Sequence, residues 1–180
     1  MSEYRVASRY AKSLITLAQE QGLLEEVHGD MQLFSGVCKE NRDFTLMLKN
    51  PIISNDIKSK ILREIFYGKV NAITSSFFDI ITRKNREMLL PAITREFHLQ
   101  YNIIHEIGMA KVTTVFALDD SLRADFKHLI GQFTGKKEVE LEEEIDDQLI
   151  GGYVLRFGGK QINESLRSKL KELKLKFSKS

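Results

Sequence analysis

The sharpest feature of this sequence is a change of pattern near Gly108. Seven of the eleven glycines fall from Gly108 onward, whereas residues 1–107 hold only four. Glycine weakens helices and permits tight turns, so the first part favours helices and the second favours turns and short strands. We therefore expect two domains, residues 1–107 and residues 108–180.

Residues 1–107 carry apolar side chains at every third or fourth position, which is typical of amphipathic helices. Gly22 is suited to end the first helix, and Ser54 is suited to cap the fourth. Pro91 fits only in the first turn of the last helix, where N–H groups have no partner within the helix. The pattern predicts a bundle of six helices over residues 3–21, 23–40, 42–48, 55–67, 70–83 and 87–107.

After Gly108 the hydrophobic period shortens towards that of β-strands. Residues 110–118 are rich in β-branched side chains, and residues 139–145 alternate apolar residues with glutamates. Gly158-Gly159 indicates a hairpin turn from residues 153–157 into residues 161–163. A helix starting at Asp119 or Asp120 and a closing helix from Ser165 complete the pattern. The expected fold class is mainly α, a six-helix bundle followed by a small α+β domain in β-α-β-β-α order.

The composition is that of an ordinary globular protein. A net charge of +2 gives no global field that would select a nucleic acid or an anionic membrane. Cys38 is the only cysteine, so the chain forms no internal disulfide and gives no sign of an oxidising compartment. The opening Met-Ser-Glu-Tyr-Arg does not resemble a signal peptide, and no eighteen apolar residues follow one another. We expect a soluble, cytosolic chain.

Motifs for catalysis and metal binding are weak. Gly158-Gly159-Lys160 resembles the end of a phosphate-binding loop, but the glycine five positions earlier is missing and Gln161 replaces the required Ser or Thr. The acidic run 138–147 lacks calcium-loop spacing and is better explained as a solvated strand face. The four histidines occur in no zinc-site spacing. We expect no catalytic residues, no metal and no cofactor.

The first helix has an unusually wide apolar surface. Its apolar residues cover about half of its circumference, whereas packing against one core normally uses a stripe of roughly 100°. A helix wedged deeply into its own bundle and a helix with an external partner explain this equally well. Residues 70–83 show a similar excess.

The C-terminal tail forms a basic amphipathic helix. From Lys160 onward the chain holds seven lysines and arginines against two glutamates. Such a helix can bind nucleic acid, a membrane surface or an acidic partner helix. Because its apolar stripe is continuous, we favour a helix that docks on its own domain with its lysines in water.

Four segments match known motifs in the same order along the chain. The matching stretches are VASRYAKSL at 6–14, LKNPIIS at 48–54, KNREMLLP at 84–91, and LIGGYVLRFG with INESLRSKL over 149–170. Together they resemble the delta subunit of bacterial F-type ATP synthase, the family of the mitochondrial oligomycin-sensitivity-conferring protein. The chain carries Asn163-Glu164 where that family usually has Asp-Gly.

The resemblance implies a non-catalytic stator subunit in a complex for proton-driven ATP synthesis. It implies that the bundle binds an N-terminal helix of the alpha subunit, and that the second domain binds the b subunits of the peripheral stalk, so that the catalytic head resists rotor torque. It also implies a peripheral location on the cytoplasmic side of the bacterial plasma membrane. The alpha-binding groove is expected at Tyr10, Ser13, Leu14, Leu17, Phe77 and Ile80. The b subunits are expected to contact Leu166, Leu170, Leu173 and Phe177.

Two other functions stay open on the residues alone. A nucleic-acid-binding adaptor would use the lysine-rich tail and show a steep dependence of binding on salt. A small-molecule enzyme would need a pocket with converging polar groups, for which the sequence offers no candidate. We expect neither nucleic acid as a partner nor an obligate homo-oligomer.

Overall fold

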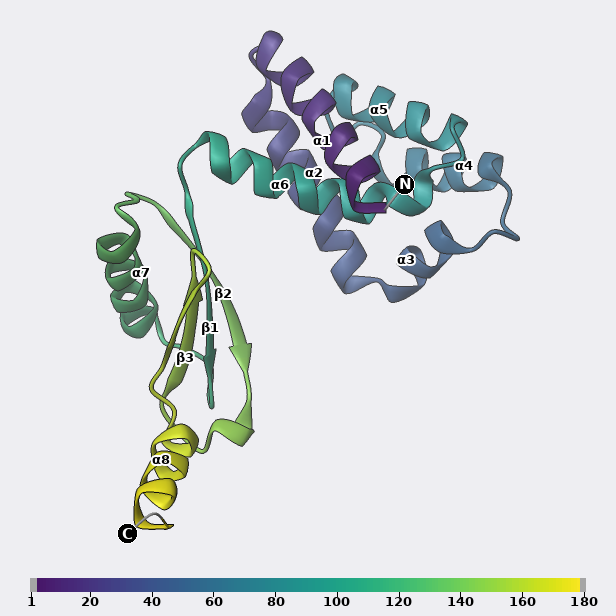
Figure 1. Ribbon diagram of the computed structural model, residues 1–180. Coiled ribbons are helices and arrows are strands. Elements are labelled where there is room, and N and C mark those ends of the chain that lie inside the picture. The colour runs from purple at the N-terminus through teal and green to yellow at the C-terminus, as the bar shows by residue number, and fades with distance from the viewer. Residues whose placement is uncertain (1–2, 179–180) are drawn as a thin grey trace. The chain divides into compact units, whose positions relative to one another are not determined.

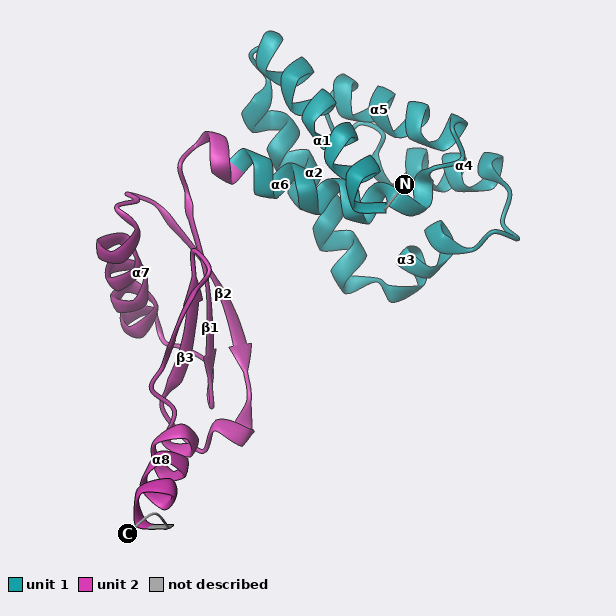
Figure 2. Ribbon diagram, in the orientation of Figure 1, with its two compact units in different colours: residues 1–101 teal, residues 102–180 magenta. Residues whose placement is uncertain are grey.

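The computed structural model describes residues 3–178 and divides into two compact units. The division falls between Tyr101 and Asn102, six residues before the boundary expected from the glycine pattern. Figure 2 colours the two units, and each is described by itself below.

The first unit is a bundle of α-helices with one 3-10 turn, shown in purple to teal in Figure 1. Gly22 follows the first helix with a φ of +68°, which a glycine adopts without strain. Pro91 lies in the first turn of the sixth helix, as expected. The elements are α1 (Glu3–Glu20), α2 (Leu24–Glu40), α3 (Arg42–Lys49), α4 (Asn55–Phe66), α5 (Ala72–Arg83), η1 (Glu87–Leu89) and α6 (Leu90–Ile104).

An aromatic cluster fills the centre of this bundle. Phe34 of α2 lies 5.4 Å from Phe66 of α4 and 5.2 Å from Phe78 of α5, measured between ring centroids. Phe44 of α3 meets Phe34 edge-on at 5.8 Å. One ring therefore joins four helices, and tilted or edge-on pairs of this kind add stability beyond the area they bury.

Two buried carboxylates fasten helices that are distant in sequence. Asp30 of α2 accepts hydrogen bonds from the backbone N–H of Asn71, at 2.8 Å, and from the hydroxyl of Thr74, at 2.6 Å. It thereby satisfies a free N–H at the start of α5.

Ser54 stands at the N-cap of α4 as expected, but its side chain makes no capping hydrogen bond.

The second buried carboxylate belongs to an ion pair. The Lys58 ammonium donates to Glu87 Oε1 at 2.7 Å and to the carbonyl oxygen of Leu48 at 3.1 Å. Lys58 is 3% exposed and Glu87 is 5% exposed. The contact joins the end of α3, the N-terminal part of α4 and η1.

The second unit is a four-stranded sheet with helix α7 on one side of it (Figure 1). The strands lie in the order β2-β1-β3-β4, with β1 and β2 parallel and the other pairs antiparallel. The fold class is as expected from the sequence, with the short arm of the hairpin forming a strand of its own. The elements are β1 (Gly108–Thr114), α7 (Asp120–Thr134), β2 (Val139–Ile145), η2 (Asp147–Leu149), β3 (Tyr153–Phe157), β4 (Lys160–Asn163) and α8 (Leu166–Ser178).

Helix α7 covers the apolar face of the sheet. Phe126 and Ile130 of α7 pack with Val112 of β1 and Leu155 of β3. The other face is polar, because Lys111 is aligned with Glu142 on one side and with Arg156 on the other. Asp119 caps α7 by accepting a hydrogen bond from the N–H of Leu122 at 2.7 Å. The acidic residues of β2 therefore lie on a solvated strand, as the sequence indicated.

Strand β1 is shorter than the sequence predicts, ending at Thr114 rather than at residue 118. The two residues that pair with Thr114 are Ile145, the last residue of β2, and Tyr153, the first residue of β3. Both neighbouring strands therefore stop at the level of Thr114. Beyond Thr114 no backbone partner continues the ladder. The β-branched residues thus predicted the strand, and the lengths of its neighbours decided its end.

Both glycine pairs, Gly151-Gly152 and Gly158-Gly159, lie in turns, and at Gly152 the structure leaves no room for a side chain. Gly158 and Gly159 have φ of +51° and +76° and form the hairpin between β3 and β4. At Gly152, with φ of +74°, an added Cβ would lie 2.2 Å from the carbonyl oxygen of Glu164. The start of β3 therefore approaches the backbone before α8 too closely for any side chain.

Asn163, which stands where the resemblance predicts an aspartate, orders the turn before α8. Its side-chain oxygen accepts hydrogen bonds from the backbone N–H of Ser165, at 3.1 Å, and from the Ser165 hydroxyl, at 2.7 Å. Ser165 in turn caps α8 by accepting from the N–H of Ser168 at 3.3 Å. The substitution therefore keeps the turn before the last helix intact.

We predict that Lys58→Met destabilises the protein by about 3–5 kcal/mol, because it leaves the buried Glu87 carboxylate without its counter-charge. Urea unfolding of the full chain measures the change. Lys60→Met, which removes an exposed ammonium from the same helix, should stay within about 0.5 kcal/mol of the parent. Lys58→Met/Glu87→Leu should recover much of the loss. Equal stability of the Lys58 and Lys60 variants would contradict a structural role for the pair.

We predict that Gly152→Ala costs more stability than Gly135→Ala. Both glycines have positive φ, +74° and +69°, so both alanines pay about 1–2 kcal/mol for the left-handed backbone. Only the alanine at 152 also meets a backbone carbonyl, since nothing lies within 4 Å of the Cβ position at Gly135. Thermal unfolding of the two variants isolates the steric cost, and identical melting temperatures would show that no close approach exists.

Candidate partner-binding surfaces

Helix α1 turns one side to the bundle and the other to solvent. Ala7, Ala11 and Ala18 are fully buried, and Leu14 lies between them on the same side. The bundle itself therefore explains most of the wide apolar surface of this helix. Two large apolar side chains of the helix stay outside: Leu17, which is 41% exposed, and Tyr4 in the first turn, which is 64% exposed.

The placement of Leu14 corrects one expectation. Leu14 is 1% exposed, so it belongs to the core and cannot form the wall of an open groove. Its position three residues before Leu17 moves it about 60° around the helix, which is enough to turn it inward. The surface on α1 is therefore drawn around Tyr10, Ser13 and Leu17.

Tyr10 marks the border between α1 and α5. Its ring meets Phe77 of α5 edge-on at 6.4 Å between centroids, and its hydroxyl accepts a hydrogen bond from Arg86 at 2.6 Å. The Arg86 guanidinium also lies 5.6 Å from the centre of the Tyr10 ring. Arg86 follows the C-terminal end of α5, so that end lies beside the N-terminal half of α1. The role of Arg86 was not apparent from the sequence.

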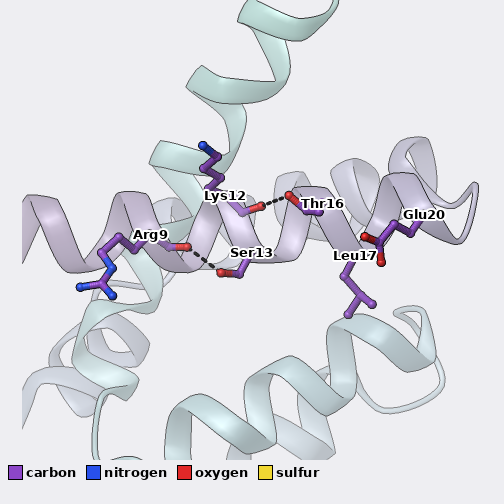
Figure 3. Close-up of a pocket in the computed structure, with 6 residues that line it drawn as sticks. All are labelled: Arg9, Lys12, Ser13, Thr16, Leu17 and Glu20. Carbon is purple, nitrogen blue, oxygen red and sulfur yellow. Dashed lines mark hydrogen bonds between the residues drawn. The ribbon is translucent and has the colours of Figure 1, made fainter.

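The outward side of α1 is a shallow open depression of about 510 Å³ (Figure 3). The hydroxyls of Ser13 and Thr16 donate back to the carbonyl oxygens of Arg9 and Lys12, each at 3.0 Å. Those hydroxyl protons are thus occupied, and the surface offers mainly methylene groups, charges and Leu17. The lining residues are Arg9, Lys12, Ser13, Thr16, Leu17 and Glu20.

Helix α5 contributes a second exposed apolar side chain. Ile80 is 47% exposed, while Phe77 is almost entirely covered. Ser76 is also exposed and lies one helical turn from Ile80. We call this combined surface the α1/α5 face; it comprises Tyr10, Ser13 and Leu17 of α1 with Ser76, Phe77 and Ile80 of α5.

Helix α8 does not dock on its own sheet, which corrects the arrangement that the sequence favoured. Its start is fixed, because the N–H of Leu166 donates to the carbonyl oxygen of Gly151 at 2.9 Å. Its apolar stripe is nevertheless open to solvent, with Phe177 80% exposed. A continuous stripe shows that a helix can bury one side, but it does not specify what covers that side. The exposed residues are Leu166, Leu170, Leu173, Leu175 and Phe177.

In the part of the chain that the structure describes, side chains suited to metal binding or catalysis do not cluster at one site. Residues 3–178 contain no cluster of three or more His, Cys, Asp or Glu side chains that could hold a metal ion. Burial raises the pKa of the Cys38 thiol, which keeps it protonated and a weak nucleophile. On β2, a hydrogen bond from Arg123 lowers the pKa of the Glu143 carboxyl. Among these residues, no helix is both long and apolar enough to cross a membrane.

The sequence and the fold both match characterised proteins. Residues 6–177 match the family model described as ATP synthase delta (OSCP) subunit. The ATP synthase subunit delta of Cytophaga hutchinsonii is 42% identical over 178 residues, which cover 99% of this chain and 97% of that protein. The delta subunit of Amoebophilus asiaticus is 38% identical, with 98% and 96% covered.

The fold comparison agrees. A chain in the cryo-EM structure of the Toxoplasma gondii mitochondrial ATP synthase hexamer superimposes with a TM-score of 0.74 at 19% sequence identity, covering 95% of this chain and 96% of that one. Since the family model spans nearly the whole chain, the chain belongs to the family of ATP synthase delta (OSCP) subunits, which are components of the peripheral stalk.

Proposed function

We propose that this chain is a non-catalytic connector that binds the catalytic head of the ATP synthase through its first unit and the stalk through its second. The observation that carries this proposal is that each unit leaves an apolar helix surface uncovered. These are the α1/α5 face with Leu17 and Ile80, and the stripe of α8 with Leu170 and Leu173. A connector needs two binding surfaces and no reaction centre.

For the first surface we propose the N-terminal helix of the alpha subunit as the partner. An amphipathic helix binds an open helical surface through a few apolar anchors at helical spacing. Leu17 and Ile80 can serve as such anchors because they project outward from two neighbouring helices. Tyr10 lies between these two helices in a fixed position, because its ring contacts Phe77 and its hydroxyl accepts a hydrogen bond from Arg86.

For the second surface we propose the b subunits of the peripheral stalk. The apolar stripe of α8 is flanked by exposed lysines, including Lys171 and Lys174, which suit a partner helix with an apolar seam and acidic edges. Both contacts would place the chain at the cytoplasmic side of the bacterial plasma membrane, attached through the complex. Binding at both ends would allow it to hold the head against rotor torque.

We predict that Leu17→Asp weakens binding of an alpha-subunit N-terminal peptide by about a hundredfold, because a carboxylate would be desolvated against the incoming helix. The melting temperature should stay near that of the parent, since Leu17 is already half in water. Titration calorimetry and thermal unfolding of the full chain measure the two effects.

Two variants calibrate that experiment. Leu33→Asp on α2 changes a side chain of matched exposure, 42%, outside the α1/α5 face and should leave binding unchanged. Leu14→Asp should unfold the bundle, because it buries a charge in the core. Equal affinity of the Leu17 and Leu33 variants would show that the peptide binds elsewhere.

We predict that Leu170→Asp/Leu173→Asp abolishes co-purification of b subunits with a tagged chain and leaves its secondary structure intact. Both side chains are exposed, so the substitution removes an interface and no internal packing. Lys171→Gln/Lys174→Gln changes the residue that follows each leucine, and it should weaken the contact only by the share of the binding free energy that comes from charge. Undiminished recovery of b with the double aspartate variant would place the stalk contact outside α8.

A further inference from the structure

The α1/α5 face carries unbalanced positive charge at one end. Arg5 and Arg9 project from the N-terminal half of α1, and Arg83, Lys84 and Arg86 lie at the C-terminal end of α5, which adjoins that half of α1. All five side chains belong to exposed residues. On each helix the cation lies one turn from the central residue of the face, because Arg9 precedes Ser13 by four positions and Arg83 follows Ile80 by three.

The carboxylates nearest in sequence to Arg83, Lys84 and Arg86 are already engaged. Asp79 accepts two hydrogen bonds from Arg63, at 3.1 and 2.9 Å, and Glu87 is buried with Lys58. Within residues 3–178, none of the five cations forms an ion pair with a carboxylate. Arg86 makes its contact with the neutral hydroxyl of Tyr10 instead.

The opposite end of the same face is acidic. Glu20 lies at the C-terminal end of α1, on the side that lines the depression in Figure 3. Glu26 of α2 accepts a hydrogen bond at 2.7 Å from Asn71, the residue that caps the start of α5. The face therefore runs from cations, past Leu17 and Ile80, to carboxylates.

We propose that the α1/α5 face selects an amphipathic helix whose acidic side chains lie at one end, against Arg9 and Arg83, and that this pairing sets the direction of the bound helix. The inference rests on the proposed function of the face and adds the charge pattern of its partner. Apolar contacts between helices are compatible with either direction, whereas opposite charges at the two ends of a face favour one. The acidic end and the apolar centre fit such a helix better than a uniformly anionic lipid surface.

The test uses the full chain and three designed peptides that share one leucine stripe. The first peptide carries glutamates in its first two turns, the second carries glutamines there, and the third carries lysines. We expect the glutamate peptide to bind about tenfold more tightly than the glutamine peptide at low salt, and the difference to shrink at high salt. The lysine peptide should bind most weakly.

Charge changes on the protein complete the test. Arg83→Gln/Lys84→Gln should reduce the affinity for the glutamate peptide about tenfold and leave the glutamine peptide unaffected. The matched control is Lys39→Gln/Lys49→Gln, which removes the last-turn lysines of α2 and α3 and should change neither affinity. Arg83→Glu/Lys84→Glu should restore binding of the lysine peptide. Thermal unfolding of each variant confirms that the bundle is intact.

The outcomes separate this inference from the proposed function. If all three peptides bind equally, the face takes a helix but does not read its charge, and the inference is wrong. If none binds, the assignment of the face itself fails and the inference fails with it. Binding to phosphatidylglycerol vesicles that depends on Arg83 and Lys84, together with equal peptide affinities, would assign the cations to a membrane and overturn the inference.

Discussion

The close packing of α1 against the bundle is the constraint on which the first unit depends. Ala7, Ala11 and Ala18 have no exposed surface, so the backbone of α1 approaches its neighbours as closely as methyl side chains permit. Because these alanines fix which side of α1 faces the bundle, they also determine which side chains of α1 face the solvent. With Leu14 drawn inward, Leu17 is the apolar residue left at the surface of the central turns. The candidate site is thus a consequence of how the helix is anchored.

The two units solve the problem of burial differently. The bundle is centred on large aromatic residues and holds its helix ends with buried carboxylates. The second unit has a smaller core, formed where α7 packs on the sheet, and ends in a helix whose apolar side is uncovered. A continuous exposed apolar stripe of this kind is uncommon in folded proteins, which supports the proposed contact through α8. A helical bundle with exposed apolar residues on α1 and α5, and a sheet followed by a helix with an uncovered apolar side, suit a protein whose function is attachment.

Sequence reasoning succeeded where a local rule decides the structure and failed where a neighbour does. Gly158-Gly159, the Ser165 cap and the position of Pro91 follow from backbone geometry, and each was predicted. The end of β1 at Thr114 depends on the lengths of β2 and β3, which no local signal encodes. Likewise, periodicity showed that Leu14 and the α8 stripe are apolar, but it could not show which of them the chain itself covers. Leu14 is buried in the bundle, whereas the α8 stripe is exposed. The contact between Arg86 and Tyr10 spans 76 positions and had no signal in the sequence.

In the binding mode proposed above, affinity and direction arise from different residues of the α1/α5 face. Leu17 and Ile80 supply apolar area, and such contacts are nearly indifferent to the direction of a bound helix. Arg9 and Arg83 at one end and Glu20 at the other are exposed and contribute little to affinity one by one, but their signs differ along the face. For a subunit that must hold a rotating machine still, direction matters as much as strength, because a helix bound backwards would lead the rest of its chain away from the head. On this proposal, the charges restrict the geometry of an attachment whose strength comes from the apolar centre of the face.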